Sequence, residues 1–92
     1  MTEELAAQSR SIKVNVSYLG FIRDMTGKKE DHFELPKPVY IRDVVLKAAE
    51  SYPKLSKIRE ILRISVNGTM TTDNLALQDG DTLSFMAPIV GG

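Results

Sequence analysis

The chain has 92 residues, a length that suits one small domain and leaves little room for a second. Its hydrophobic fraction of 42% is typical of a globular protein. Twelve basic residues balance twelve acidic ones, so no net field attracts nucleic acid or an acidic membrane. Because the sequence contains no cysteine, disulfides, thiol nucleophiles and thiolate metal sites are excluded, and a single histidine leaves little material for histidine-based catalysis.

The first ten residues do not resemble a targeting segment. Glu3 and Glu4 stand where a secretory signal would be basic, and no apolar run follows them. No stretch approaches the roughly eighteen apolar residues that a membrane span requires. We therefore expect a cytoplasmic protein whose residues 1–10 form a flexible N-terminal extension.

Strand patterns come first along the chain. Residues 12–18 alternate apolar and polar side chains, the period of a half-buried strand. Residues 20–31, with two glycines and a charged run, break this alternation and indicate a hairpin connection. A short second strand is expected over residues 32–35 and should stop at Pro36, because proline cannot donate to a strand ladder.

The spacing then changes to that of a helix. From Tyr40 on, apolar residues recur at helical intervals, and Pro53 should end the helix. The apolar face consists of Ile41, Val44, Val45, Ala48 and Tyr52. Residues 54–60 form a second, shorter helical candidate.

The last third of the chain returns to strands. Residues 62–66 alternate and lead directly into Asn67-Gly68, the preferred pair for a two-residue type I′ turn, so residues 69–71 should return as the partner strand. A polar turn at residues 78–81 precedes the final strand, residues 82–86.

These elements predict one fold. A single amphipathic helix cannot bury its apolar face alone, so it should lie across one face of a mixed sheet. The first and last strands are the most apolar, and we place them side by side at the centre. The prediction is an α+β roll of the β-grasp type over residues 11–88, followed by a flexible tail at residues 89–92.

No side chain offers a credible catalyst or ligand site. His32 is expected at the surface, because one imidazole lacks a visible ligand or nucleophile partner. Asp79 and Asp81 are too sparse for a calcium loop and are better explained by a solvated turn. No phosphate-binding glycine motif is present. We therefore expect no bound metal and no bound cofactor.

The C-terminus carries the chemistry. The chain ends on Gly91-Gly92, soon after the last predicted strand. A frayed end is the ordinary interpretation. However, a tail attached to a central strand has a fixed base, and two residues without Cβ can enter a channel too narrow for any side chain. The Gly92 carboxylate would become an acyl electrophile once one oxygen becomes a good leaving group, as in an acyl-adenylate.

The succession of segments resembles the MoaD/ThiS family of ubiquitin-like sulfur carriers over residues 11–92, and within it the archaeal MoaD-like proteins. The likeness is carried by Ile12-Lys13-Val14, residues 20–27, Val66-Asn67-Gly68, residues 77–81 and residues 85–92. The resemblance implies a β-grasp fold and a C-terminus that carries sulfur.

The resemblance also implies a reaction and its partners. An ATP-dependent adenylating enzyme of the MoeB or ubiquitin-activating type would activate the Gly92 carboxylate, and a sulfur donor would convert it into a thiocarboxylate. The tail, with Gly91 and Gly92 as functional residues, would then enter the MoaE-like large subunit of molybdopterin synthase and donate sulfur for the molybdenum cofactor. This chain would be the small subunit of that sulfurtransferase, with no catalytic activity alone and with ATP bound only by its partner.

Docking residues follow from the same resemblance. It places Phe85, Met86 and Pro88 on the surface that meets the partners, although Met86 and Ala87 stand where bacterial small subunits often have an aromatic residue and a proline. If the Phe85 ring is buried, it belongs to the core instead.

The resemblance leaves other functions open. Small archaeal modifiers of this family join target lysines through an isopeptide bond, so protein conjugation is the alternative function. A thiazole-pathway carrier, whose chains are typically shorter, and a plain binding module with an unused tail are the remaining alternatives.

Charge is unevenly distributed along the sequence. Residues 64–92 contain three aspartates and no lysine or arginine, whereas residues 42–63 carry six basic side chains against three acidic ones. An acidic region around the tail would steer docking toward a basic cleft. An ordinary solvated surface explains the same distribution equally well.

Overall fold

The structure is a computed structural model that describes residues 10–88. Its elements are β1 (Ser11–Tyr18), α2 (Phe21–Thr26), β2 (Glu30–Pro36), α3 (Ile41–Ser51), the 3₁₀-helix η1 (Pro53–Ile58), β3 (Arg63–Val66), β4 (Thr69–Thr71) and β5 (Thr82–Met86). Residues 1–9 and 89–92 lie outside the described range, so the extension and the tail stay predictions. At the edge of the range, the Arg10 carbonyl accepts a hydrogen bond from the Lys37 N–H at 2.7 Å.

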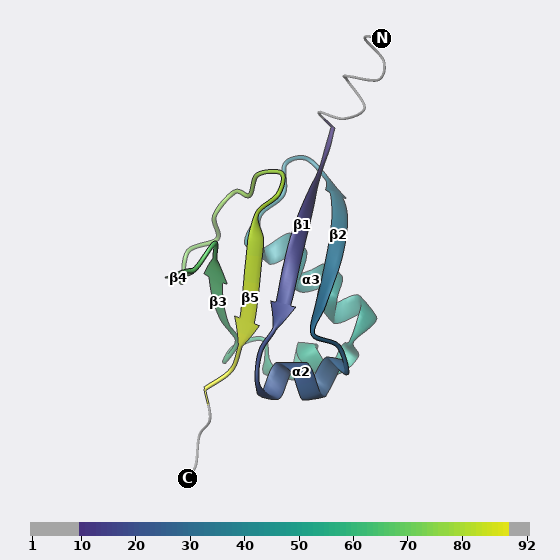
Figure 1. Ribbon diagram of the computed structural model, residues 1–92, viewed down its shortest axis with the longest axis vertical. Coiled ribbons are helices and arrows are strands. Elements are labelled where there is room, and N and C mark those ends of the chain that lie inside the picture. Colours follow the sequence, from purple (N-terminus) through teal and green to yellow (C-terminus); the bar gives the residue numbers. More distant parts are fainter. Residues whose placement is uncertain (1–9, 89–92) are drawn as a thin grey trace.

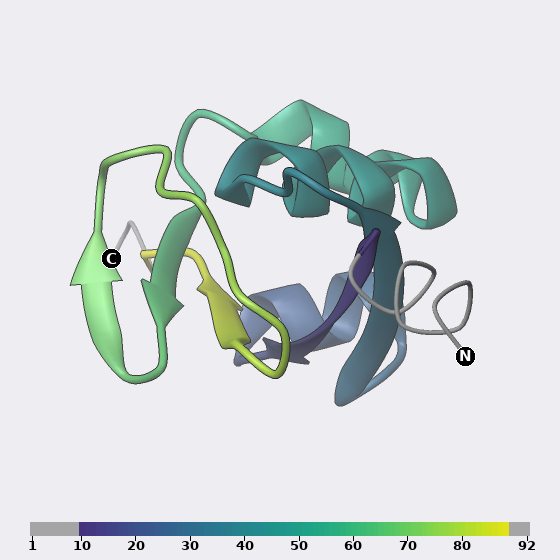
Figure 2. The ribbon, with the colours of Figure 1, turned by 90° about the horizontal axis from the view of Figure 1, so that it is seen from above.

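The strands form one mixed sheet in the order β2-β1-β5-β3-β4. β1 and β5 run parallel, and the other neighbouring pairs are antiparallel. Figure 1 shows α3 behind this sheet, and Figure 2, seen from above, shows that α3 lies across one face only. The predicted arrangement, with the first and last strands adjacent and one main helix across the sheet, is therefore present.

The core lies between the sheet and α3. Alternate residues of β1 and β5 are buried on the helix side, as the period of two requires. The buried apolar residues of these strands and of α3 are Ile12, Val14, Val16, Tyr18, Leu83, Phe85, Ile41, Val44, Ala48 and Ala49. Each fully buried large apolar side chain contributes about 1.5–3 kcal/mol, so this face decides the position of the helix.

The turn between β3 and β4 has the predicted geometry. Asn67 and Gly68 both have positive φ, 50° and 87°, as a type I′ turn requires. Asn67 also bonds to the first residue of β5: its N–H donates to the Thr82 carbonyl at 2.7 Å, and its side-chain oxygen accepts from the Thr82 N–H at 3.0 Å. One turn residue therefore joins the β3–β4 hairpin to the beginning of the last strand.

The predicted hairpin connection between the first two strands is confirmed, because β1 and β2 pair antiparallel, but the connection contains the short helix α2, which was not predicted. Gly20 and Gly27 border this helix with φ of 52° and 73°. The Gly27 N–H donates to the Arg23 carbonyl at 2.8 Å, which closes the last turn. Ile22 is wholly buried and Met25 is partly buried against the core, so apolar contacts hold the helix in place. The glycines are the boundaries of a helix, not marks of an irregular loop.

The second predicted helical segment, residues 54–60, differs in type and bounds in the structure. Residues 53–58 form the 3₁₀-helix η1, which begins at Pro53, with Leu55 buried. Within residues 10–88, no helix has the length and apolar character needed to cross a membrane.

A polar cluster joins the sheet to the end of α3. The Asp31 carboxylate on β2 accepts hydrogen bonds from the Tyr18 hydroxyl at 2.9 Å and the Tyr52 hydroxyl at 2.7 Å, and Lys28 Nζ lies 3.2 Å from its other oxygen. Burial raises the pKa of Asp31, but the hydrogen bonds from Tyr52, Tyr18 and Lys28 outweigh it and hold the pKa below its ordinary value of 3.8. The carboxylate therefore stabilises the fold in its charged form.

Because the folded-state pKa of Asp31 is depressed, its contribution to stability is complete above about pH 4 and is lost as the pH falls through the folded pKa. We expect Asp31→Asn to unfold at lower urea concentration at neutral pH and to lose less stability on acidification than the unaltered chain. Tyr18→Phe, which removes one donor to the carboxylate, should cost about 1.5–3 kcal/mol.

Urea unfolding between neutral and acidic pH measures both effects. Asp24→Asn on the exposed surface of α2 is the control, and its stability should change by less than about 0.5 kcal/mol. If acidification lowers the free energy of unfolding of Asp31→Asn as much as that of the unaltered chain, the stabilising role given to the Asp31 carboxylate is contradicted.

Candidate functional site

The strand that leads to the C-terminus is held on both sides. β5 pairs with β1 from Thr82 to Phe85 and with β3 from Leu83 to Met86. Beyond the end of β1, the Leu19 N–H donates to the Phe85 carbonyl at 3.0 Å. The backbone is therefore fixed up to the point at which the chain leaves the sheet, and the predicted tail starts from a defined position.

Phe85 lies in the core. Its ring is wholly buried and packs edge-to-face on Tyr18 with a centroid separation of 5.9 Å. Tyr18 in turn contacts Tyr52 edge-to-face at 5.7 Å. Of the two roles that the sequence leaves open for Phe85, the structure supports the core role, because a ring with no exposed area offers nothing to a docking partner.

Met86 and Pro88 lie where a partner can reach them. Met86 is half-buried on the face of the sheet away from Phe85, as the strand alternation requires, and Pro88 is exposed. Gly91 and Gly92 lie outside the described residues, so the structure places neither of them. The predicted docking residues are thus divided between core and surface.

Three further apolar side chains are exposed around the end of β5. Leu19, Phe21 and Ile61 have exposed fractions of 42%, 53% and 42%. Leu19 bonds directly to the Phe85 backbone, Phe21 begins α2, and Ile61 accepts a hydrogen bond from Arg63, the register partner of Met86. Figure 1 shows α2 and the beginning of β3 at the end of the sheet where β5 finishes. We call Leu19, Phe21, Ile61, Met86 and Pro88 the tail-base surface.

Sequence reasoning missed Leu19, Phe21 and Ile61. Leu19 follows the buried Tyr18 and so breaks the alternation, and Phe21 lies just after Gly20, within the predicted hairpin connection. The sequence does contain a signal for these residues. Two large apolar residues stand next to each other at the end of a strand, and a third follows just after the glycine.

The acidic turn lies at the opposite end of β5. Asp79 Oδ1 accepts from the Lys13 N–H at 2.7 Å, and Asp81 accepts from the Gln78 N–H at 2.8 Å and the Asn67 side-chain amide at 3.0 Å. These carboxylates therefore brace the beginning of the strand, where the sequence predicted only a solvated turn. The expected acidic region around the tail is wrong, because the length of β5 separates Asp79 and Asp81 from the tail-base surface.

The remaining sequence candidate is His32. Its ring is exposed on β2, with Nδ1 2.6 Å from the Asn15 side-chain oxygen and Nε2 3.2 Å from the Glu30 carboxylate. Within residues 10–88, no group of three or more histidine, aspartate or glutamate side chains is arranged to hold a metal ion.

Comparison with known proteins finds similar sequences. Residues 16–92 match the ThiS family. The chain is 27% identical over 82 residues to the molybdopterin synthase sulfur carrier subunit of Mycobacterium tuberculosis, an alignment covering 88% of this chain and 99% of that protein. It is 24% identical over 82 residues to the protein of the same name from Arabidopsis thaliana, covering 89% of this chain and 85% of that protein.

Solved structures share the fold. The putative molybdopterin converting factor, subunit 1, of Pyrococcus furiosus superposes with a TM-score of 0.72 at 26% identity, over 85% of this chain and 99% of that chain. Small archaeal modifier protein 1 of Methanosarcina acetivorans has a TM-score of 0.76 at 20% identity, over 89% and 98%. A chain of the complex of subunits 1 and 2 of the Helicobacter pylori molybdopterin-converting factor has a TM-score of 0.59 at 23% identity, over 88% and 100%.

These likenesses confirm the predicted β-grasp fold and the resemblance to the sulfur carriers. Because the match extends from within β1 to the C-terminal residue, this chain belongs to the ThiS family.

Proposed function

We propose that this chain is a sulfur carrier that acts as the small subunit of molybdopterin synthase. Gly92 would be its reactive residue. A partner enzyme would use ATP to convert the Gly92 carboxylate into an acyl-adenylate with release of pyrophosphate, and sulfide-level sulfur from a donor would displace AMP at the carbonyl carbon to give a thiocarboxylate. In the large subunit of the synthase, the sulfur would pass to the precursor of molybdopterin, and water would supply the oxygen that restores the Gly92 carboxylate. The molybdopterin synthase sulfur carrier subunits among the relatives support this assignment.

The geometry of β5 is the observation that carries the proposal. A central strand paired on both sides ends at an exposed apolar surface, so the predicted tail starts from a fixed base beside a place for a partner. Holding that base limits the positions available to the reactive carbonyl, which favours its reaction in a partner's active site. The two terminal glycines add no side chain that a narrow channel would exclude.

The tail-base surface is the proposed docking site for both partners. Phe21 and Met86 are of residue types that are enriched in interface cores. The complex of subunits 1 and 2 seen for the Helicobacter pylori factor supports a large-subunit partner of the same type.

Protein modification through Gly92 is the second candidate function. The fold is shared with small archaeal modifier protein 1 of Methanosarcina acetivorans, and conjugation to lysine would start from the same activated carboxyl group. The two functions differ in the nucleophile that attacks the acyl-adenylate or its successor: sulfur in one case and a lysine amine in the other.

Intact mass spectrometry tests the first function. Incubation with the cognate adenylating enzyme, ATP and a sulfur donor should give a species heavier by the exchange of one oxygen for sulfur. Gly92→Ala should lower the yield because its methyl group obstructs the narrow site, while its thermal unfolding stays unchanged. Omission of ATP is the control. A cognate activator and donor that leave the mass unaltered would reject sulfur carriage.

Partner binding tests the tail-base surface. Phe21→Ala should weaken the complex with the large subunit but leave stability within about 0.5 kcal/mol. Phe85→Ala should instead lose about 3–5 kcal/mol of stability through the cavity it creates. Calorimetric binding and urea unfolding, measured on both variants, distinguish a loss of affinity for the partner from a loss of stability.

Leu46→Ala, an exposed apolar residue on α3, is the matched control and should affect neither measurement. Tight binding by Phe21→Ala would exclude that residue from the interface.

Digestion of proteins from cells that express the active chain tests conjugation. Because no lysine or arginine follows Arg63, the digestion must use a protease that cleaves after valine, such as elastase, so that the cut falls after Val90. Lysines carrying a Gly-Gly remnant should then appear if the chain is a modifier, and they should vanish when Gly92 is deleted. Their absence from cells in which the thiocarboxylate is detected would assign the chain to sulfur transfer alone.

A further inference from the structure

The end of the sheet at which β5 finishes carries an excess of positive charge. It is built from α2, the beginnings of β2 and β3, the end of α3 and η1, which packs against α2 (Figure 1). Most charged residues of these segments balance in number. The balanced pairs are Arg23 with Asp24, Lys28 with Asp31, Lys29 with Glu30, Lys47 with Glu50, and Arg59 with Glu60.

Three exposed cations at this end have no acidic counterpart. They are Lys54 and Lys57 on η1 and Arg63 at the beginning of β3, and we call them the basic rim. The salt bridges found within residues 10–88 join other residues, so none of them neutralises the rim. Asp79 and Asp81 lie at the opposite end of β5, a full strand away.

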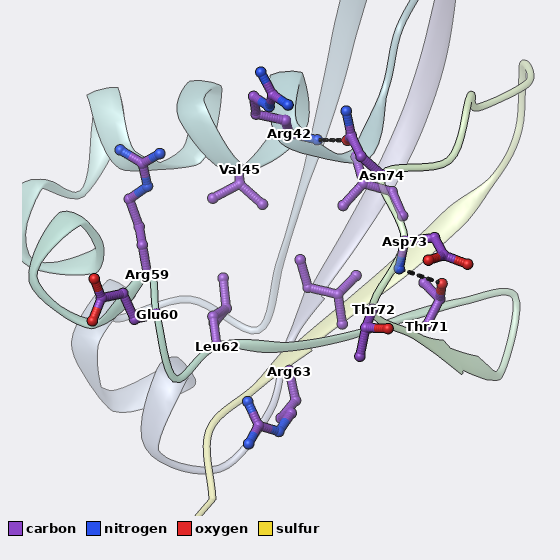
Figure 3. Close-up of a pocket in the computed structure, with 12 residues that line it drawn as sticks. Arg42, Val45, Arg59, Glu60, Leu62, Arg63, Thr71, Thr72, Asp73 and Asn74 are labelled. Atoms are coloured by element: carbon purple, nitrogen blue, oxygen red, sulfur yellow. Dashed lines mark hydrogen bonds between the residues drawn. The ribbon is translucent and has the colours of Figure 1, made fainter.

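Arg63 stands directly beside the tail-base surface. It is the register partner of Met86, and paired residues of neighbouring strands point to the same face of a sheet. Because Phe85 is buried on the α3 side, Met86 and Arg63 project from the opposite face. In Figure 3, Leu62 and Arg63 accordingly extend to opposite sides of the chain. A hydrogen bond of 3.4 Å to the Ile61 carbonyl keeps the Arg63 guanidinium close to this surface.

The two lysines extend the positive charge over η1. A 3₁₀-helix has three residues per turn, so Lys54 and Lys57 project from the same side of it. Leu55 is wholly buried, which fixes the orientation of η1 on the domain. α2, against which η1 packs, begins with Phe21 of the tail-base surface. The rim therefore borders the region from which the predicted tail starts.

The position of the rim favours a protein partner. Protein interfaces combine an apolar core with a polar, solvent-accessible border, and here exposed apolar residues and unpaired cations occupy the same end of the domain. An anionic membrane or a nucleic acid would attract the same cations, but neither offers a channel to the tail. Charge complementarity then requires carboxylates on the surface that receives this end of the chain.

We propose that the basic rim steers this chain onto an acidic border around the tail channel of the synthase large subunit. The inference rests on the proposed function and adds to it the sign of the charge that the partner presents. Carboxylates of the partner attract Lys54, Lys57 and Arg63 before contact, and the planar fork of Arg63 suits a carboxylate in the complex. Because rim charges remain hydrated, their effect falls mainly on the association rate.

Stopped-flow association of the full chain with the cognate large subunit tests the proposal. The rate constant should fall between about 0.01 M and about 0.1 M salt, because the Debye length shortens from about 30 Å to about 10 Å. At low salt, Lys57→Glu and Arg63→Glu should each lower the rate constant by about threefold or more, with a smaller change in the dissociation rate.

Lys37→Glu is the matched control. It reverses an exposed charge just beyond the end of β2, at the other end of the sheet, and changes the net charge of the chain by the same amount. Its association rate should equal that of the unaltered chain. Glu60→Gln, which removes an acid from the rim's own end, should raise the rate. Amide spectra and thermal unfolding confirm that each variant folds.

Several outcomes would overturn the proposal. An association rate that ignores salt would do so, and so would an equal loss in Lys37→Glu, which would mean that only the net charge matters. Faster association of Arg63→Glu would give the partner a basic border instead. Binding of anionic vesicles or oligothymidylate that Arg63→Glu abolishes, without a charge effect on the large subunit, would make lipid or nucleic acid the occupant.

Failure of the inference and failure of the proposed function give different results. A chain that gains sulfur by mass spectrometry but associates without charge dependence would retain sulfur carriage and reject the acidic border. A chain that associates as expected but never gains sulfur would retain the acidic border and reject sulfur carriage. Absence of any complex with the large subunit would overturn both.

Discussion

The parallel pairing of β1 and β5 is the interaction on which the rest of the structure depends. It joins the first and last strands of the domain, which are the two adjacent strands in the middle of the sheet. The middle of the sheet therefore forms only when the last strand has folded back beside the first. Closing the long loop between such distant strands costs conformational entropy before the contacts between them contribute favourable free energy. Once made, the pairing fixes β5 between two neighbours and gives the chain beyond Met86 a defined origin.

The aromatic residues behind this strand connect the two layers. Phe85 packs on Tyr18, Tyr18 packs on Tyr52, and both tyrosine hydroxyls donate to Asp31. One chain of contacts thus runs from the last strand through the sheet to the end of α3.

Much of the fold could be predicted because its signals are local. Strand alternation, the helical spacing from Ile41 and the Asn67-Gly68 turn each follow from a few neighbouring residues. α2 was not predicted because its apolar contacts with the core, made by Ile22 and in part by Met25, form no periodic pattern in so short a segment. The charge distribution failed for a related reason: sequence distance put Asp79 and Asp81 near the tail, but a strand carries its two ends apart. Leu19 and Ile61 are far apart in the sequence, and only the strand order places their segments at the same end of the sheet, so no linear pattern linked them.

The two ends of the described chain leave the sheet in opposite directions, with β1 beginning at one end of the molecule and its parallel neighbour β5 finishing at the other (Figure 1). A pull along the C-terminal strand therefore loads its hydrogen bonds to both neighbours in shear, all at the same time, whereas a hairpin pulled at its open end gives way one bond after another. An enzyme that draws the last residues into a deep channel can apply tension without unravelling the domain. Mechanical resistance of this kind comes from the direction of the strands, with no requirement for exceptional thermodynamic stability.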